Sequence, residues 1–344
     1  MGRTALLMVM GLGMALAVIS FNISGTTERA LNNNFTYYKY MNGRNLARTA
    51  IHAALRGFDK NTNPDTTAIV VYNYGSYQIK SLKLSASPYD TVWMTSKGYY
   101  SDTSYTMKVK LYRSTKPFPG VTGAIGIRAT PVEFTVNGQP DVDGRNYDAT
   151  GTTLVGSGDM PGVAVMNSDD STTVYDSGAD LYGTVKVKND TTTANPAQYI
   201  SEYLLNADYY LTAGNYSAQT YGSAANPVIV VCETPADTND AVRFGGGTVG
   251  YGILAVKGNI EISGTFDWYG LIVVFGESNS VKFTGGGTPK IVGGLIVAQP
   301  EGGAASLFLK GSGANGKVLY SSDALRNARN IGKLRYYSIV DWYE

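Results

Sequence analysis

TALLMVMGLGMALAVISFNI, residues 4–23, is the stretch on which the rest of the chain depends. It is almost wholly apolar and contains no charged residue. An α-helix rises about 1.5 Å per residue, so about twenty such residues cross the hydrocarbon core of a bilayer. Arg3 is the only charged side chain before this stretch, which favours a cytoplasmic amino end and an exported body. We therefore predict a membrane-spanning helix here.

The helical pattern continues to residue 58. Apolar residues recur three to five positions apart, close to the period of one helix face. These positions are Leu31, Phe35, Tyr38, Met41, Leu46, Ala50, Ala54 and Phe58. The other face carries Glu28, Arg29, Lys39, Arg44, Arg48 and Arg56. Residues 1–58 are thus predicted to form one helix, with a local unwinding near residues 20–25, where Ser, Asn and Gly weaken helical structure.

The apolar segment has two alternative interpretations. One is a cleaved secretory signal, although such a signal has a shorter apolar core and is not followed by about thirty more helical residues. The other is a simple membrane anchor, which does not explain why the helix continues. Within the segment, Gly11/Ala15 and Gly13/Ala17 form two pairs of small residues at helical spacing. Such pairs permit close helix packing, but Gly and Ala are also common in membrane helices for other reasons.

Composition excludes several functional classes. The chain has 344 residues, a net charge of +1 and a pI of about 7.6, so nothing indicates a nucleic-acid partner. One Cys and one His exclude an intramolecular disulfide and a Cys/His zinc site, and we predict no cofactor. Abundant Gly and Tyr with only 16% charged residues suit a β-rich exported surface.

Residues 44–56 (RNLARTAIHAALR) resemble the second helical half of the PilX-like minor-pilin class, and residues 1–58 look like the mature N-terminus of a type IV pilin-like protein. The resemblance implies that the helix polymerises into a homo-oligomeric filament. It also implies that Met1 is the methylated first residue after leader cleavage; the alternative is that Met1 is the initiator. Major pilins carry an acid at position five that neutralises a neighbour's amino terminus. This chain has Ala5, which puts that contact and the major-subunit role in question.

Residues 59–123 are predicted to form an antiparallel β-sheet packed on the second half of the helix. The β-type runs are Thr67–Tyr74, Tyr77–Ser85, Thr91–Tyr100 and Ser104–Arg113. Turns are expected at Gly75-Ser76 and Ser101-Asp102. Residues 124–225 are interpreted as a mixed irregular and β region, with a short helix near residues 196–208.

The acidic cluster in residues 139–148 is a weak candidate for a calcium site. Asp141, Asp143 and Asp148 offer oxygen ligands, but no Glu closes an EF-hand loop. A polar turn rich in Asp and Asn is the favoured interpretation, and no metal is predicted.

An internal repeat predicts a β-solenoid-like domain over residues 226–344. One apolar run recurs at Val228–Val231, Ile253–Val256, Leu271–Val274 and Leu295–Ala298. The last three follow Gly252, Gly270 and Gly294. A second, alternating run follows each, and stacking these runs places Arg243, Glu261 and Lys282 in one outward charge ladder. A helix over Asp323–Ile331, with Asp323 as its N-cap, is expected to cap the repeat, and Leu334–Glu344 to form a final strand. The glycine-led coils and the aromatic tail also resemble the PilX-like class.

No catalytic residue is predicted. His52 lies inside the amphipathic helix, and Cys232 follows an apolar strand as a small buried hydrophobe would. A solenoid polysaccharide enzyme would need a carboxylate pair, for which Glu261, Asp267 and Glu277 are available. Paired aromatics leave a carbohydrate-binding head as an alternative. These are Tyr99-Tyr100, Tyr209-Tyr210, Trp268-Tyr269 and Tyr336-Tyr337.

The sequence thus predicts an α+β protein, a structural subunit of an extracellular type IV pilus-like filament. Before assembly it would be anchored in the inner membrane beside the pilus assembly machinery. The first alternative is a low-copy minor pilin or adhesin at the filament tip, with surface glycans as partners. The second is a membrane-anchored solenoid enzyme.

Overall fold

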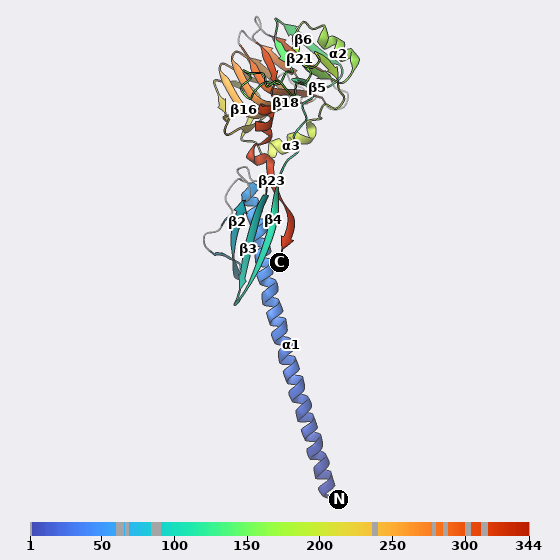
Figure 1. The fold of residues 1–344 in the computed structure, drawn as a ribbon, viewed down its shortest axis with the longest axis vertical. Helices are drawn as coiled ribbons and strands as arrows, with labels where there is room; N and C mark the ends of the chain where they lie inside the picture. The colour runs from blue at the N-terminus through green and yellow to red at the C-terminus, as the bar shows by residue number, and fades with distance from the viewer. Residues whose placement is uncertain are drawn as a thin grey trace. The chain divides into compact units, whose positions relative to one another are not determined.

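The computed structural model describes residues 2–59, 65, 69–83, 91–235, 240–276, 280–284, 288–299, 304–310 and 316–343. The chain divides into two compact units, Met1–Ser114 with Tyr336–Glu344, and Thr115–Arg335. The predicted α+β class is confirmed, because a long N-terminal helix is followed by a β-rich region that begins with an antiparallel sheet (Figure 1).

Helix α1 (Gly2–Asp59) is the main element of the first unit. It is uninterrupted, so the unwinding expected near residues 20–25 does not occur. The hydroxyl of Thr26 donates to the carbonyl of Asn22, and that of Thr27 to the carbonyl of Ile23, both at 2.8 Å. These side chains bond within the helix instead of competing with it.

A five-stranded sheet packs against the C-terminal part of α1 (Figure 1). Its strands lie in the order β1 (Val70–Tyr72), β2 (Gly75–Lys83), β3 (Thr91–Tyr100), β4 (Thr103–Thr115) and β23 (Arg335–Tyr343). The expected turn at Ser101-Asp102 is present, whereas the first hairpin turns at Asn73-Tyr74, two residues earlier than predicted. Asn73 adopts a positive φ of 50°, which Asn tolerates well. The final strand therefore belongs to this sheet and not to the solenoid.

The core of the first unit lies between α1 and the inner face of this sheet. Buried residues are Ala47, Ala50, Ile51, Ala54, Ile79, Val92, Met94, Tyr105, Met107, Val109 and Leu111. A Cβ on Gly98 would lie only 2.2 Å from the Gly43 carbonyl oxygen, so β3 and α1 are in close backbone contact. The predicted apolar helix face is only partly buried. Leu31, Phe35 and Tyr38 are more than half exposed, and the side chain of Phe58 lies outside the described residues.

The second unit is a stack of parallel coils built around three long strands. These are β16 (Thr248–Lys257), β18 (Phe266–Phe275) and β20 (Lys290–Ala298). Each carries a glycine with positive φ near its middle, Gly252, Gly270 or Gly293, and the three pair in register. Beyond that glycine the neighbours change: β20 pairs with one strand through residues 290–293 and with another through residues 295–298. Each long strand thus contributes to two sides of the stack.

We name the three sides by these strands. Side 1 contains the first halves of the long strands with β13 (Thr220–Tyr221), β22 (Lys317–Tyr320), β7 (Asp141–Asp143) and β9 (Asp180–Tyr182). Side 2 contains their second halves with β11 (Tyr209–Thr212), β14 (Val228–Glu233), β5 (Ile125–Arg128), β8 (Val163–Val165) and β10 (Val187–Asn189). Side 3 contains β12 (Gly214–Ser217), β15 (Ala241–Gly245), β17 (Asn259–Ser263), β19 (Ser280–Thr284), β21 (Ala305–Lys310) and β6 (Val132–Asn137).

The order of coils in space is not the order of the chain. Strands β5, β6 and β7 pair with β20, β21 and β22, so residues 125–143 form the coil next to the one that ends at residue 320. The predicted mixed irregular and β region over residues 124–225 has the β-strands expected of it, but β5, β6 and β7 belong to the coil stack and not to a separate region. These strands are three to six residues long, too short to show a period. The helix expected near residues 196–208 is α3 (Ala197–Leu205).

The helices of this unit differ in part from expectation. α4 (Ser322–Arg329) is capped by Ser321 instead of Asp323, because the Ser321 hydroxyl accepts from the Ala324 amide. α4 and α3 cover the outer face of side 2, where Leu325, Ala328 and Tyr203 pack on the outward side chains. At the end of the stack lies α2 (Ser168–Tyr175), which contacts β6, β8 and β10 and buries Val174 in the core. A short 3₁₀ turn, η1 (Gly332–Leu334), precedes β23.

Burial on both faces explains the continuous apolar runs. On side 2, Val230, Leu254 and Ile272 face the core, whereas Ile229, Ile253 and Leu271 face the helices. The fourth run is shifted by one residue from the expected alignment, because Leu271 pairs with Gly294 and Ile272 with Leu295. The bend in β20 is accordingly at Gly293 and not at Gly294.

Candidate functional site

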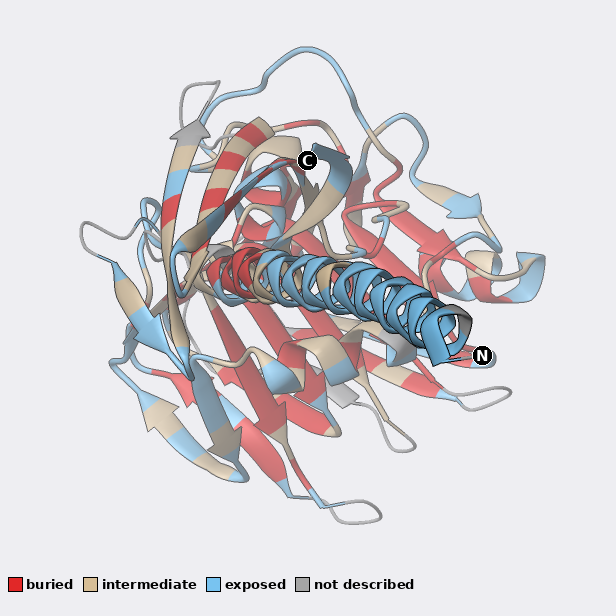
Figure 2. Ribbon diagram, turned by 90° about the horizontal axis from the view of Figure 1, so that it is seen from below, coloured by how far each residue is buried: buried red, intermediate tan, exposed pale blue. Residues whose placement is uncertain are grey.

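The N-terminal part of α1 is an uncovered apolar surface. Every large apolar side chain from Leu6 to Ile23 is between 53% and 83% exposed. Figure 2 accordingly draws α1 pale blue from its N-terminal end and red only near its other end. Within the described chain, one helix is long and apolar enough to span a membrane, with a mean hydropathy of 2.2 over the best window. An N-terminal signal sequence can share this length and composition.

The small residues predicted to mediate helix packing lie on this uncovered segment. A Cβ placed on Gly11 or Gly13 would have no atom within 4 Å beyond the adjacent residues and backbone of its own helix, and Ala15 and Ala17 are exposed. Residues four apart share one helix face, so each small pair offers a flat patch to a neighbouring helix. Met1, the expected site of processing, lies outside the described residues.

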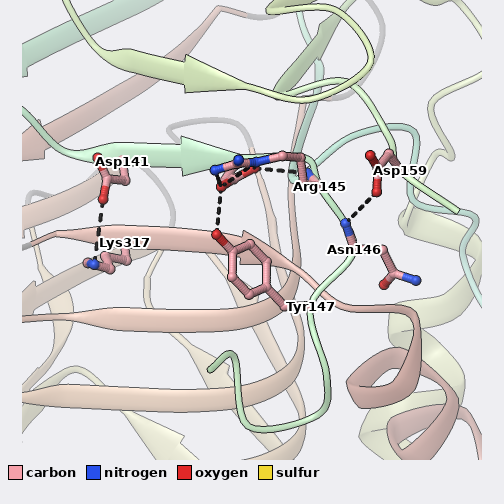
Figure 3. Close-up of polar contacts among 7 residues, drawn as sticks. Asp141, Arg145, Asn146, Tyr147, Asp159 and Lys317 are labelled. Carbon is pink, nitrogen blue, oxygen red and sulfur yellow. Dashed lines mark hydrogen bonds and ion pairs between the residues drawn. The ribbon is translucent and has the colours of Figure 1, made fainter. Parts of the chain in front are cut away.

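A second candidate site is a polar cavity on side 1 of the coil stack. It has a volume of about 560 Å³, within the range of small-molecule sites. It is lined by Asp141, Asp143, Arg145, Tyr147, Gly151, Thr152, Tyr182, Asp267, Thr288, Lys290, Lys317 and Leu319. Acidic, basic and aromatic side chains therefore meet in one place, although they come from distant parts of the sequence (Figure 3).

Asp143, Arg145 and Tyr147 form the most ordered part of this cavity. Arg145 makes a bidentate ion pair with Asp143, whose closest atoms are Nη2 and Oδ2 at 2.6 Å, and the Tyr147 hydroxyl donates to Asp143 at 2.8 Å. The Asp143 side chain is only 3% exposed. Burial raises its pKa, but the hydrogen bonds from Arg145 and Tyr147 outweigh burial and the pKa is lowered. Burial, with the hydrogen bond to Asp143, raises the pKa of Tyr147 to about 12.

The three aspartates considered for calcium do not meet at one point. Asp141 lies 3.6 Å from Lys317, and Asp143 is paired with Arg145. Asp148 instead closes its own turn, where an amide hydrogen bond from Thr152 lowers its pKa to about 2. Among the described residues, no group of three His, Cys, Asp or Glu side chains could hold a metal ion.

The charge ladder runs along side 3. Strand pairing puts Arg243 opposite Glu261, and Glu261 opposite Lys282. Arg243 Nε donates to Glu261 at 2.7 Å, while the flanking Val242, Phe244, Ile260 and Ile262 are fully buried. The side chain of Lys282 lies outside the described set, so only the first pair has known contacts.

The residues considered for catalysis are scattered. His52 is exposed on α1, with its ring 6.2 Å from that of Trp342. Cys232 is completely buried in the solenoid core, and burial raises the pKa of its thiol. Glu261 is paired on side 3, Asp267 lines the cavity on side 1, and Glu277 is outside the described residues.

The aromatic pairs do not form one surface either. Tyr38 and Tyr100 meet edge to face in the first unit. On side 1, Tyr251 stacks on Tyr269 with ring centroids 4.8 Å apart, whereas Trp268 is fully buried in the core. Lys290, Lys317 and Tyr182, which line the cavity, do not stand out in the sequence. Their only signal is strand register, and a single sequence does not give it.

Comparison with known proteins does not assign this chain to a family. No family model matches the sequence, and no curated protein matches it. Among the solved structures that align with this chain is the competence-associated pilin ComZ from Thermus thermophilus, which covers 89% of this chain and 96% of its own. The aligned residues are 10% identical and the TM-score is 0.24, which does not establish a shared fold.

Proposed function

We propose that this protein is a structural subunit of an extracellular filament of the type IV pilus kind. Its N-terminal helix would anchor it in the inner membrane, beside the assembly machinery, and would then pass into the filament core. The supporting observation is that the uncovered apolar part of α1 continues without a break into the part that packs in the first unit. Burying one large apolar side chain contributes about 1.5–3 kcal/mol, so a segment with so many of them requires lipid or other helices around it.

In this proposal identical helices replace lipid around one another. The small pairs Gly11/Ala15 and Gly13/Ala17 let neighbouring helices approach closely, which matters because apolar surface alone gives no preference for protein over lipid. No Asp or Glu occurs in the first 27 residues, so no side-chain carboxylate there can pair with an amino terminus or with Arg3. Packing, and not a buried ion pair, would hold the filament core. Met1 as a methylated first residue belongs to this proposal.

A low-copy minor subunit at the filament tip is the second candidate. Ala5, which stands where major subunits of the resembled family carry an acid, favours it. So does the polar cavity, because a tip subunit needs a binding surface. Filament abundance distinguishes the two roles. We propose no enzymatic role: of the carboxylates considered for polysaccharide chemistry, Glu261 lies on side 3 and Asp267 on side 1, and Glu277 is outside the described residues.

The experiment is to express Gly13→Leu and compare the membrane-bound pool with sheared filaments by quantitative blotting and negative-stain microscopy. Leu stays apolar, so membrane insertion should be unchanged, while its bulk should reduce filaments at least tenfold. Met14→Leu is the matched control, because it keeps side-chain size on a neighbouring position of the same segment. Ala5→Glu, which restores the acid of the resembled family, should keep its filaments. Normal filaments from Gly13→Leu would contradict the packing proposal, and the absence of filaments from cells producing the parent protein would contradict the filament itself.

A further inference from the structure

Side 1 carries a row of charged residues that neither the helix nor the solenoid core uses. One outward position on each of five neighbouring strands is charged: Asp267, Lys290, Lys317, Asp141 and Asp180. Strands in a sheet lie about 4.8 Å apart, so the part of the row from Asp267 to Asp141 extends about 14 Å. The first four members line the 560 Å³ cavity.

Among the hydrogen bonds of the described residues, these four side chains keep unused capacity. Lys317 Nζ lies 3.6 Å from the Asp141 carboxylate, beyond hydrogen-bond distance. Lys290 Nζ donates to the Thr150 carbonyl at 2.7 Å, which leaves two of its three N–H groups for another acceptor. Nowhere in the described chain does a donor reach the Asp267 carboxylate, which is half-buried in the cavity.

Asp143, which lines the same cavity, differs from these four side chains because its hydrogen-bonding capacity is used. It receives hydrogen bonds from the Arg145 side chain, the Arg145 amide and the Tyr147 hydroxyl, so its acceptor sites are occupied. This cluster lines the cavity, and Figure 3 shows Arg145 and Tyr147 close together there. The row beside it, in which lysines are central and carboxylates flank them, is the part that has donors and acceptors to offer a ligand.

We propose that this cavity binds an acidic oligosaccharide. A sugar carboxylate would lie between Lys290 and Lys317, and flanking hydroxyl groups would donate to Asp267 and Asp141. The central pair of ammonium groups requires an anionic acceptor. The outer carboxylates require donors, which sugar hydroxyls supply and a phosphate dianion does not. The spacing of neighbouring strands is close to the length of one sugar unit. Tyr182, 42% exposed, also lines the cavity, with the Arg145 guanidinium over its ring at 5.0 Å.

The charge of the lining fits a ligand of this kind. Asp141, Asp143 and Asp267 balance Arg145, Lys290 and Lys317, so the cavity has no net charge. With no net charge in the lining, recognition rests on local contacts: one sugar carboxylate lies between the two lysines, and hydroxyl groups of the flanking sugars face Asp267 and Asp141, with the carboxylates of those sugars turned to solvent. The site lies wholly within the second unit and does not rest on filament assembly.

The test is isothermal titration calorimetry of the detergent-solubilised full chain with trigalacturonate, compared with its fully methyl-esterified form. The ester keeps the size and hydroxyl groups and removes the charge, so it should bind at least tenfold more weakly. Equal affinity for the two probes, or no binding of trigalacturonate at millimolar concentration, would overturn the proposal. Neither result would affect the filament proposal, because filament formation is measured in a separate experiment.

Variants locate the site. Lys290→Gln and Lys317→Gln should each weaken trigalacturonate binding at least tenfold. Lys257→Gln is the matched control, because Lys257 is a similarly exposed lysine that pairs with Glu233 at 2.6 Å on side 2. Its affinity should equal that of the parent protein. Unchanged affinity in both cavity variants, or an equal loss in Lys257→Gln, would also overturn the assignment.

Discussion

At the residue scale, Asp143 is a buried charge whose surroundings make it sensitive to pH. Its lowered pKa means that the folded state stabilises the ionised form of Asp143 relative to the unfolded chain, in which an Asp has a pKa of about 3.9. The ion pair therefore stabilises the fold above that pH, and the contribution is lost as pH falls through the lower folded pKa.

We expect Asp143→Asn to lower the free energy of unfolding by about 1–3 kcal/mol at pH 7, because Arg145 and Tyr147 lose a charged acceptor. The difference from the parent protein should shrink as the pH is lowered to about 3. Fluorescence of the buried Trp268 reports on this unit once Trp93 and Trp342 are replaced by Phe. Asp169→Asn, on the exposed surface of α2, should show no such narrowing. If the difference in free energy of unfolding between Asp143→Asn and the parent protein did not change with pH, Asp143 would not be the group responsible.

The cavity shows why single residues of a site are hard to predict in a solenoid. Asp141 and Asp267 are visible in the sequence as acids, but their place in one row with Lys290 and Lys317 follows from strand register. The sequence repeat aligns Leu271 with Leu295, whereas the structure pairs Leu271 with Gly294. A shift of one residue exchanges the inward and outward faces, so it decides which side chains line a groove.

At the scale of elements, the charge ladder on side 3 predicts that opposite charges on successive coils stabilise the stack. The Arg243–Glu261 pair is exposed at 46% and 24%, and a cross-strand pair of this kind contributes about 0.2–1 kcal/mol. Thermal unfolding of Arg243→Gln, Glu261→Gln and the double variant should give a coupling energy in that range, smaller at high salt.

The exchanged pair is the control for this cycle. Arg243→Glu combined with Glu261→Arg should recover most of the stability lost in either single charge reversal, because opposite charges again face each other across β15 and β17. Additive losses would show that the two side chains do not interact.

Predictability differs between elements for physical reasons. Helix α1 and strands β3 and β4 repeat their pattern over many residues, and α1 is correct to within two residues at each end. Strands such as β7, β8 and β9 have three residues each and are stabilised by their neighbours in the stack. Their own side chains carry too little periodic signal to indicate a strand.

At the scale of the whole molecule, the sequence indicates the kinds of element better than their connections. The final strand follows the last coil in the chain, which predicts that it belongs to the solenoid, yet β23 completes the sheet beside β4. Residues 125–189 show short β runs without a clear period, which predicts a mixed irregular and β region apart from the repeat, yet their strands pair with the last coil in the chain. Both errors have one cause, since pairing across a long separation leaves no local pattern.

The placement of β5 to β7 beside β20 to β22 has a consequence for how the protein is made. When residues 125–143 leave the ribosome, the strand they pair with does not yet exist, because Ile125 pairs with Leu295. The coils of residues 209–320 pair with near neighbours in the chain and can form one after another, whereas the earlier segment must wait. Pulse-labelled hydrogen exchange during refolding should protect amides of β16 and β18 before those of β5 and β7, and the reverse order would refute this pathway. A nascent chain that stops before β20 would therefore hold an unpaired segment near its beginning, open to proteases and to wrong partners until synthesis is complete.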